Sequence, residues 1–237
     1  MCTLSFYNGI NQVIITSNRD ENSLRPNAIH PKKINLKNTT VYCPIDPQHN
    51  GTWFAVNQKG DVFVLLNGAE YKHISKPPYK KSRGLILLEL ADHDNILENW
   101  QSIDLKGIEN FTLIVYVEKK LFHFSWNGSE KSCQELNENK PYIWSSSTLY
   151  DNTTRKKRED EFNALIAKNN QNISSDDLIN FHTMTEMENN SEGIIINRTS
   201  NILTKNISQI ILKSNTFNLH HWDLIDDNQS SLQIDYA

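Results

Sequence analysis

Two short stretches near the N-terminus carry the residue types needed for nucleophilic chemistry. Cys2 directly follows the initiator methionine, and Asn18-Arg19-Asp20 comes close behind it in IITSNRDE. Removal of Met1, which a small second residue such as cysteine permits, would place a thiol and a free α-amine on one residue. That amine is partly unprotonated near neutral pH and can act as the base for its own thiol. The sequence therefore predicts an N-terminal cysteine nucleophile that needs no histidine.

Such a nucleophile needs charged neighbours. A carboxylate such as Asp20 would orient the ammonium form of the amine, and a cation such as Arg19 would favour the thiolate. A hairpin formed by strands at 2–7 and 13–16 would return both residues to the side of Cys2. Each feature also has an ordinary structural interpretation, because Cys2 could be a small residue that starts a strand and Asn-Arg-Asp-Glu could be an exposed turn.

Acyl chemistry also requires hydrogen-bond donors that face the developing oxyanion. Asn67 is the candidate, because it ends the apolar run 62–66 and is followed by Gly68, which allows close approach of the backbone. The alternative is that Asn67 is a turn residue that terminates the strand.

The pattern of apolar residues predicts strands, then helices, then strands again. Runs rich in Val, Ile, Phe and Thr predict strands at 3–7, 13–16, 52–56, 62–66, 111–117 and 121–126. Helical periodicity predicts helices at 83–90, 94–100, 153–168 and 175–181. Further strands are expected at 193–197, 201–204 and 207–213, followed by a polar tail. We expect one α+β layered domain over residues 1–237, with two sheets covered by helices.

Composition narrows the classes of partner. The net charge is −4, and the main basic run, Arg155 to Arg158, is followed at once by acidic residues, so we interpret it as a solvated helix face and expect no nucleic-acid partner. No apolar stretch reaches the roughly 18 residues of a membrane span, and the start does not resemble a signal peptide. We therefore expect a cytoplasmic protein. Its three cysteines suit neither a disulfide framework nor a zinc site.

Several of these residues together resemble the NRDE family, also known as the transport and Golgi organisation protein 2 family. The resemblance is strongest over residues 1–90 and thinner at 146–151 and 204–210. It rests on Met1-Cys2, Ser17 to Glu21, Arg25-Pro26, Gly51-Thr52-Trp53, Asn57, Gly60, Asn67 and Ser82-Arg83-Gly84.

The resemblance implies the four-layer αββα sandwich of two mainly antiparallel sheets found in N-terminal nucleophile (Ntn) hydrolases. The chain looks closest to the cysteine branch that cleaves non-peptide amides, so the implied substrate is a small amide or acyl thioester. The implied catalytic residues are Cys2, Arg19, Asp20, Asn67 and Arg198, and Asn18 and Ser147 would bind substrate. Two departures stand out: Ser145 to Ser147 occupy the place of a second oxyanion asparagine, and Arg198 is a loose counterpart of a late arginine.

The resemblance also implies a second kind of function, because family members have been linked to haem trafficking and to lipid or acyl-coenzyme A metabolism. The hydrolase needs no cofactor, whereas a carrier would bind haem or a hydrophobic ligand in the same cleft. His220 and His221 are adjacent on an expected strand and would point to opposite faces, which favours a surface feature near a polar tail. His182 with Glu186 could ligate a metal, although a histidine at a helix end favours interaction with the helix dipole. A scaffold that does neither is the third alternative.

Overall fold

The first of two antiparallel sheets contains the first and the last strand of the described chain. The computed structural model describes residues 2–185 and 193–236. The strand order of this six-stranded sheet is β10-β1-β2-β11-β12-β13. Its strands are β1 (Cys2–Asn8), β2 (Val13–Asn22), β10 (Tyr142–Ser145), β11 (Ile202–Leu212), β12 (Thr216–Asp223) and β13 (Asn228–Asp235).

The second sheet has seven strands in simple sequential order, β3-β4-β5-β6-β7-β8-β9, and all its pairings are antiparallel. Most neighbouring strands are joined by short connections, but residues 68–110 form a long connection between β6 and β7. Its strands are β3 (Ile29–Asn35), β4 (Thr40–Ile45), β5 (Phe54–Asn57), β6 (Val62–Asn67), β7 (Phe111–Val117), β8 (Lys120–Trp126) and β9 (Lys131–Leu136).

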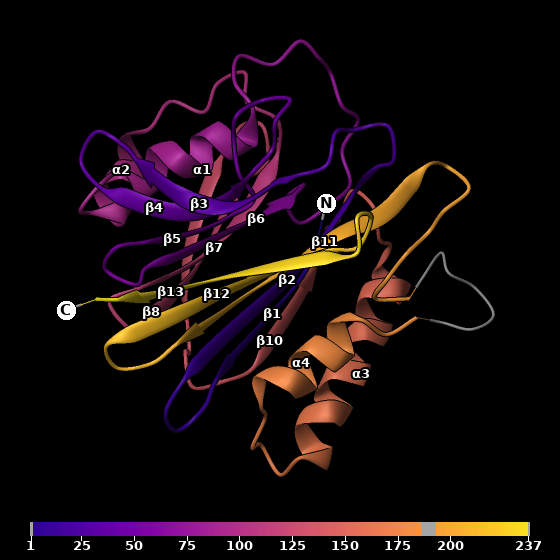
Figure 1. Ribbon diagram of the computed structural model, residues 1–237. Coiled ribbons are helices and arrows are strands. Elements are labelled where there is room, and N and C mark those ends of the chain that lie inside the picture. The colour runs from indigo at the N-terminus through magenta and orange to yellow at the C-terminus, as the bar shows by residue number, and fades with distance from the viewer. Residues whose placement is uncertain (1, 186–192, 237) are drawn as a thin grey trace.

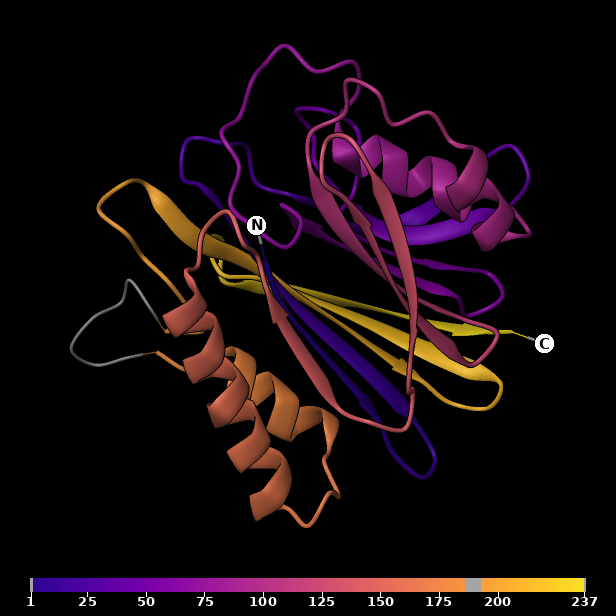
Figure 2. The same cartoon turned by 180° about the vertical axis from the view of Figure 1, so that it is seen from behind.

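Two helix pairs cover the outer faces of the sheets and complete four layers (Figures 1 and 2). Helices α1 (Arg83–Ala91) and α2 (Ile96–Ser102) lie against the seven-stranded sheet, and α3 (Asn152–Lys168) and α4 (Ser175–His182) lie against the six-stranded sheet. The predicted αββα sandwich is confirmed. No helix among the described residues is long and apolar enough to span a membrane.

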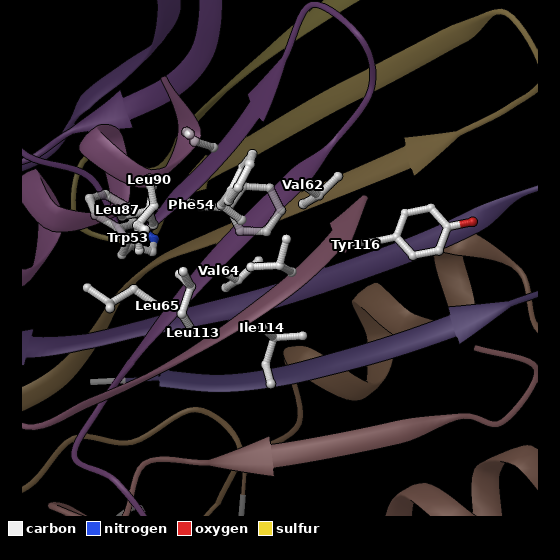
Figure 3. Close-up of a cluster of buried hydrophobic side chains, with 14 of the residues drawn as sticks. Trp53, Phe54, Val62, Val64, Leu65, Leu87, Leu90, Leu113, Ile114 and Tyr116 are labelled. Atoms are coloured by element: carbon white, nitrogen blue, oxygen red, sulfur yellow. The ribbon is translucent and has the colours of Figure 1, made fainter. Parts of the chain in front are cut away.

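The alternation of side chains along β2 assigns its residues to two different apolar clusters. Ile15 belongs to the large cluster between the sheets and under α1, part of which Figure 3 shows with Leu87, Leu90 and Trp53. Ile14, one residue earlier, belongs to the smaller cluster formed with α3 and α4. A strand buried on both faces has this arrangement. The same alternation therefore decides on which face each residue of Asn18-Arg19-Asp20 lies.

The C-terminal third differs from the sequence-based expectation. The strands expected at 201–204 and 207–213 are one continuous strand, β11, and the strand expected at 193–197 is a series of bends with an isolated bridge from Asn197 to Leu203. The expected polar tail forms β12 and β13. Strand β13 is exposed at alternate residues because it is an edge strand, so its sequence lacks the apolar residues that identify a buried strand.

The basic run at the start of α3 is only partly the solvated face that we expected. Lys156 is exposed and pairs with Glu159 and Asp160, as predicted. Arg158 is only 1% exposed, so the prediction is wrong for this residue. Its position explains the difference, because Arg158 and Phe162 are four residues apart and therefore lie on the same buried face of the helix.

Candidate active site

Strands β1 and β2 form the predicted hairpin, and its register pairs Cys2 with Arg19. Strand β11 lies on the other side of β2 and pairs Asn206 with Arg19 and Thr204 with Asp20. A β-bulge between Thr204 and Asn206 interrupts that register. The backbone of Cys2 therefore lies at the end of a strand, directly beside the NRDE segment.

Arg19 lies on the inner face of the sheet, in a buried cluster of charged groups. Its guanidinium lies 4.6 Å from the centre of the Trp53 ring, and its Nη2 is 3.6 Å from Glu21 and 3.7 Å from Asp46. Arg25 pairs with the same two carboxylates, at 3.2 and 2.5 Å. Burial alone would raise the pKa of Glu21, but the surrounding positive charges outweigh it and hold that pKa below its usual value. The cluster therefore contains ionised groups of both signs.

Arg19 and Asn67 line the same small cavity, which has a volume of about 90 Å³. The three segments that carry much of the family resemblance, around residues 25, 51–53 and 82–84, meet there. The lining residues are Arg19, Glu21, Arg25, Asp46, His49, Gly51, Thr52, Trp53, Leu65, Asn67, Ser82, Arg83 and Gly84. Residues that are distant in the sequence thus form one polar site near the C-terminal end of β2, which pairs with the start of β1.

Close contact between two glycines brings the N-terminus of α1 to this cavity. A Cβ atom on Gly84 would lie 2.7 Å from the carbonyl oxygen of Thr52, and one on Gly51 would lie 2.8 Å from the backbone of Gly84. Both distances are too short for any other residue without a shift of the backbone. Glycine is therefore required at both positions because the two backbones touch.

Asn67 and Ser147 lie close together on a second cavity, of about 400 Å³. The backbone of Gly68 has φ of +84°, and a Cβ there would lie 2.4 Å from the Ser147 hydroxyl oxygen. Ser146 also donates a hydrogen bond of 2.6 Å to the backbone oxygen of Asn67. The serine segment that takes the place of the second asparagine is thus next to the proposed oxyanion donor.

Asp20 lies on the opposite face of the sheet from Arg19 and is fully buried. One carboxylate oxygen accepts a hydrogen bond from the hydroxyl of Tyr150, and the other accepts one from the hydroxyl of Thr204, both at 2.6 Å. Burial raises the pKa of Asp20, and these two hydrogen bonds oppose the rise. Burial also raises the pKa of Tyr150 well above its usual value, so its hydroxyl stays protonated and remains a donor.

Asn18 is on the same face as Asp20, and its side chain is fully used by contacts within the protein. Its amide nitrogen donates to the backbone oxygens of His182 and Ile194, and its amide oxygen contacts Nδ1 of His182 at 2.6 Å. The other ring nitrogen of His182 contacts the Ser5 hydroxyl at 2.7 Å. These contacts give Asn18 a structural role in attaching α4 to β2.

Arg198 does not line the cavity that contains Arg19. It lies 5.1 Å from the centre of the Tyr150 ring and donates a hydrogen bond to the backbone oxygen of Leu149. With Ser147 and Tyr150 it lines a third cavity, of about 590 Å³, beside the start of α3. Its side chain therefore contacts the ring of Tyr150, the residue that holds Asp20.

The sequence analysis missed a group of buried polar residues on the inner face beside Arg19. Asn206 is the neighbour of Arg19 on β11, and Ser208 lies between Ser17 and His221 in the next row. Among the described residues, the side-chain polar atoms of Ser17 and Asn206 and the Nε2 atom of His221 are buried without a hydrogen-bond partner. A polar patch between two sheets is unusual, and the alternation of polar residues along β11 is the signal that could have revealed it.

The histidines considered as ligands for haem or a metal differ in their burial. His221 is fully buried, so the expected surface feature is wrong for this residue, although the adjacent His220 is partly exposed. Burial lowers the pKa of His182 to about 3, which contradicts a charged histidine that interacts with the helix dipole. Glu186 lies outside the described residues. The part of the chain that is described contains no cluster of three or more potential metal ligands.

The model of one protein family, described as Transport and Golgi organisation 2, matches residues 1–223. The chain belongs to this family. No curated protein matches it. The resemblance seen in the NRDE segment thus extends over nearly the whole chain.

Solved structures of an acid amidase and of a bile acid hydrolase share the fold of this member of the family. A Caenorhabditis elegans N-acylethanolamine-hydrolyzing acid amidase ortholog superposes with a TM-score of 0.62 at 13% identity, covering 88% of this chain and 92% of that chain. A mutant of the conjugated bile acid hydrolase from Clostridium perfringens gives a TM-score of 0.55 at 13% identity, with coverage of 100% and 97%. At such identities the likeness establishes the Ntn-hydrolase fold alone.

Proposed function

We propose that this protein is a cysteine hydrolase that cleaves a non-peptide amide or an acyl thioester, with Cys2 as its N-terminal nucleophile. One observation carries the proposal: the register places Cys2 beside Arg19, and Arg19 shares a cavity with Asn67. Acyl transfer requires a nucleophile, and a nearby cation and an amide donor assist it. The register brings the backbone of Cys2 beside this cation, and the cation shares its cavity with the amide donor. The fold shared with amide-cleaving enzymes supports the same reaction class.

In the proposed first step, the α-amine of Cys2 takes the proton of the thiol, and the thiolate attacks the substrate carbonyl carbon. Asn67 donates a hydrogen bond to the oxyanion, and the positive charge of Arg19 favours the thiolate. The bond between the carbonyl carbon and the leaving nitrogen or sulfur then breaks, and the leaving group takes the proton from the ammonium. An acyl-cysteine thioester remains.

In the second step, the same amine removes a proton from water while the water oxygen attacks the thioester carbonyl. The C–S bond breaks, the carboxylic acid leaves, and the proton returns to the Cys2 thiolate. The α-amine of Cys2 can act as the base in either step only after Met1 has been removed. Asp20, which lies on the other face of the sheet, takes part as the carboxylate that orients the ammonium.

The first test combines intact mass with covalent labelling. We expect the mass of the untagged protein from its native source to lack one methionine, and an activated acyl thioester probe to label Cys2. Cys2→Ala should abolish the labelling, whereas Cys133→Ala, which changes an exposed cysteine on β9, should retain it. Equal labelling of the Cys2→Ala protein, or retention of Met1, would contradict the proposal.

A carrier of haem or of a lipid or acyl-coenzyme A is the second candidate function. The cavities of about 590 and 400 Å³ favour it, because both are within the size range of small-ligand sites and share Ser147 and Arg155 in their linings. The two functions differ in their dependence on Cys2. Saturable, stoichiometric ligand binding that is unchanged in Cys2→Ala, without acyl transfer in the wild type, would favour the carrier.

A further inference from the structure

The buried carboxylate of Asp20 is held by two hydroxyl groups from different parts of the chain. Tyr150 belongs to the segment before α3, and Thr204 belongs to β11. Each donates one hydrogen bond of 2.6 Å, and each donates to a different carboxylate oxygen. Two donors on two oxygens fix the plane of the carboxylate as well as its position.

The two donors carry no charge. Hydroxyl donors favour the ionised form of a buried carboxylate, yet they leave its negative charge to be balanced by a nearby cation. In the proposed hydrolase, the ammonium of Cys2 is such a cation, at the start of the strand that pairs with the Asp20 strand.

Arg158 fixes Tyr150 and connects it to the first residues of β1. Its guanidinium carbon lies 3.7 Å from the centre of the Tyr150 ring, within the range of a cation–π interaction. Its Nη1 donates a hydrogen bond of 2.6 Å to the hydroxyl of Thr3, the residue that follows Cys2. A second donor nitrogen, Nη2, contacts the backbone oxygen of Gly193. One buried side chain therefore joins α3, Tyr150 and the N-terminal strand.

We propose that Tyr150 and Thr204 are positioning residues that hold the Asp20 carboxylate toward the α-amine of Cys2, and that Arg158 holds Tyr150 in place. This inference rests on the proposed function, in which that amine is the base. It explains why an arginine in a charged helix segment is fully buried. Arg198 also contacts this network, because its guanidinium lies 5.1 Å from the centre of the Tyr150 ring.

The direction of the expected effect follows from the charges around Asp20. Burial raises the pKa of the Asp20 carboxyl, and the hydrogen bonds from Thr204 and Tyr150 lower it, so loss of either donor raises this pKa further. A less ionised and less ordered carboxylate stabilises the ammonium less, so the pKa of the amine falls. The other groups near this face are Arg158 from α3, Arg198, and His182 from α4. His182 stays neutral because burial lowers its pKa to about 3.

The test measures the rate of Cys2 alkylation by iodoacetamide against pH, with mass spectrometry to confirm the site and removal of Met1. Tyr150→Phe and Thr204→Val each remove one hydroxyl and keep the side-chain shape. We expect both to shift the profile to lower pH and to slow acyl transfer from the thioester probe roughly tenfold, the usual effect of losing a hydrogen bond to a charged group. Tyr142→Phe is the matched control, because Tyr142 lies on β10 with its ring stacked on Trp144. It should leave the pH profile of alkylation and the rate of acyl transfer unchanged.

The outcomes separate this inference from the function on which it rests. If acyl transfer to Cys2 occurs but Tyr150→Phe and Thr204→Val behave like Tyr142→Phe, the positioning role is wrong and the hydrolase stands. If the alkylation profile shifts as expected but no probe acylates the wild type, the hydrolase proposal fails and the positioning role stands. Thermal melts of each variant exclude unfolding as the cause, and retention of Met1 would overturn both proposals.

Discussion

Arg19 and Asp20 are adjacent in the sequence, but their side chains lie on opposite faces of the six-stranded sheet. Arg19 contacts Trp53 and Asp46 between the sheets, whereas Asp20 contacts Tyr150 on the side of α3. Strand geometry requires this separation. Arg19 and Asp20 therefore lie on different sides of the strand that pairs with β1, each with its own set of partners.

Removal of Arg19 should destabilise the protein strongly. The residue is 3% exposed, and Arg19→Met would remove a cation that pairs with Glu21 and Asp46. We expect the free energy of unfolding to fall by about 3 kcal/mol, as when one partner of a buried pair is lost. Urea titration measures it. Lys59→Met, which removes an exposed ion pair with Asp94, should change little, and equal effects of the two variants would contradict the buried cluster.

Substitutions two residues apart in α3 should have very different effects. Arg158→Met removes a buried cation that contacts Tyr150 and Thr3, and we expect it to lower the free energy of unfolding by about 3 kcal/mol. Lys156→Met changes an exposed residue of the same helix and should have little effect. Denaturant unfolding of the two variants compares the buried and solvated faces. Similar curves would mean that Arg158 is not buried in solution.

Acid should destabilise the protein through two buried histidines. Burial lowers the pKa of His182 and of His221 to about 3, from the 6.5 that is usual for a histidine side chain. The unfolded state therefore binds more protons between these values, so stability is complete above about pH 6.5 and falls as pH decreases toward 3. Each histidine should contribute about 1.4 kcal/mol per pH unit at roughly pH 5.

Urea unfolding at several pH values tests this dependence. The slope of the free energy of unfolding against pH reports the difference in bound protons between the two states. His221→Phe should reduce that difference by about one proton, whereas replacement of the exposed His93 should leave the slope as it is. A slope that is the same in wild type and His221→Phe would mean that His221 accepts a proton in the folded state.

Gly84→Ala should destabilise the protein although Gly84 lies in a helix. Helix propensity alone predicts stabilisation by about 1 kcal/mol. The new Cβ would instead lie 2.7 Å from the Thr52 carbonyl oxygen, so α1 or the 51–53 segment must shift. We expect a net loss of about 1 to 3 kcal/mol, measured by thermal and urea unfolding. Stabilisation would show that the two backbones are not in contact.

The buried amide of Asn206 predicts the direction in which its replacement changes the stability of the protein. Its amide is fully buried beside Arg19, and among the described residues it has no hydrogen-bond partner. We expect ordered water to complete these bonds together with Ser17 and His221. Asn206→Leu should then lower the free energy of unfolding by about 1 kcal/mol. An increase in stability would indicate a dry site, because an apolar residue would relieve an unsatisfied group.

The sequence by itself determined the local features of this protein. Apolar alternation and turn residues predicted the hairpin that pairs Cys2 with Arg19, and periodicity predicted all four helices, because these signals depend on near neighbours in the chain. The Ntn-like fold class followed from the family resemblance. The sequence did not reveal six of the strands, namely β3, β4, β9, β10, β12 and β13. At β13 the exposed edge position leaves no apolar pattern to detect.

Only the tertiary structure decided which distant residues meet at the site. Tyr150 and Thr204 reach Asp20 across 130 and 184 residues of chain. Arg158 is buried although its sequence neighbours are charged. No local pattern encodes such contacts, because a buried charge or hydroxyl is stabilised by partners that the fold brings from elsewhere in the chain. The residues that could do chemistry were visible in the sequence, but the groups that orient them became identifiable only when the sheets and helices were packed together.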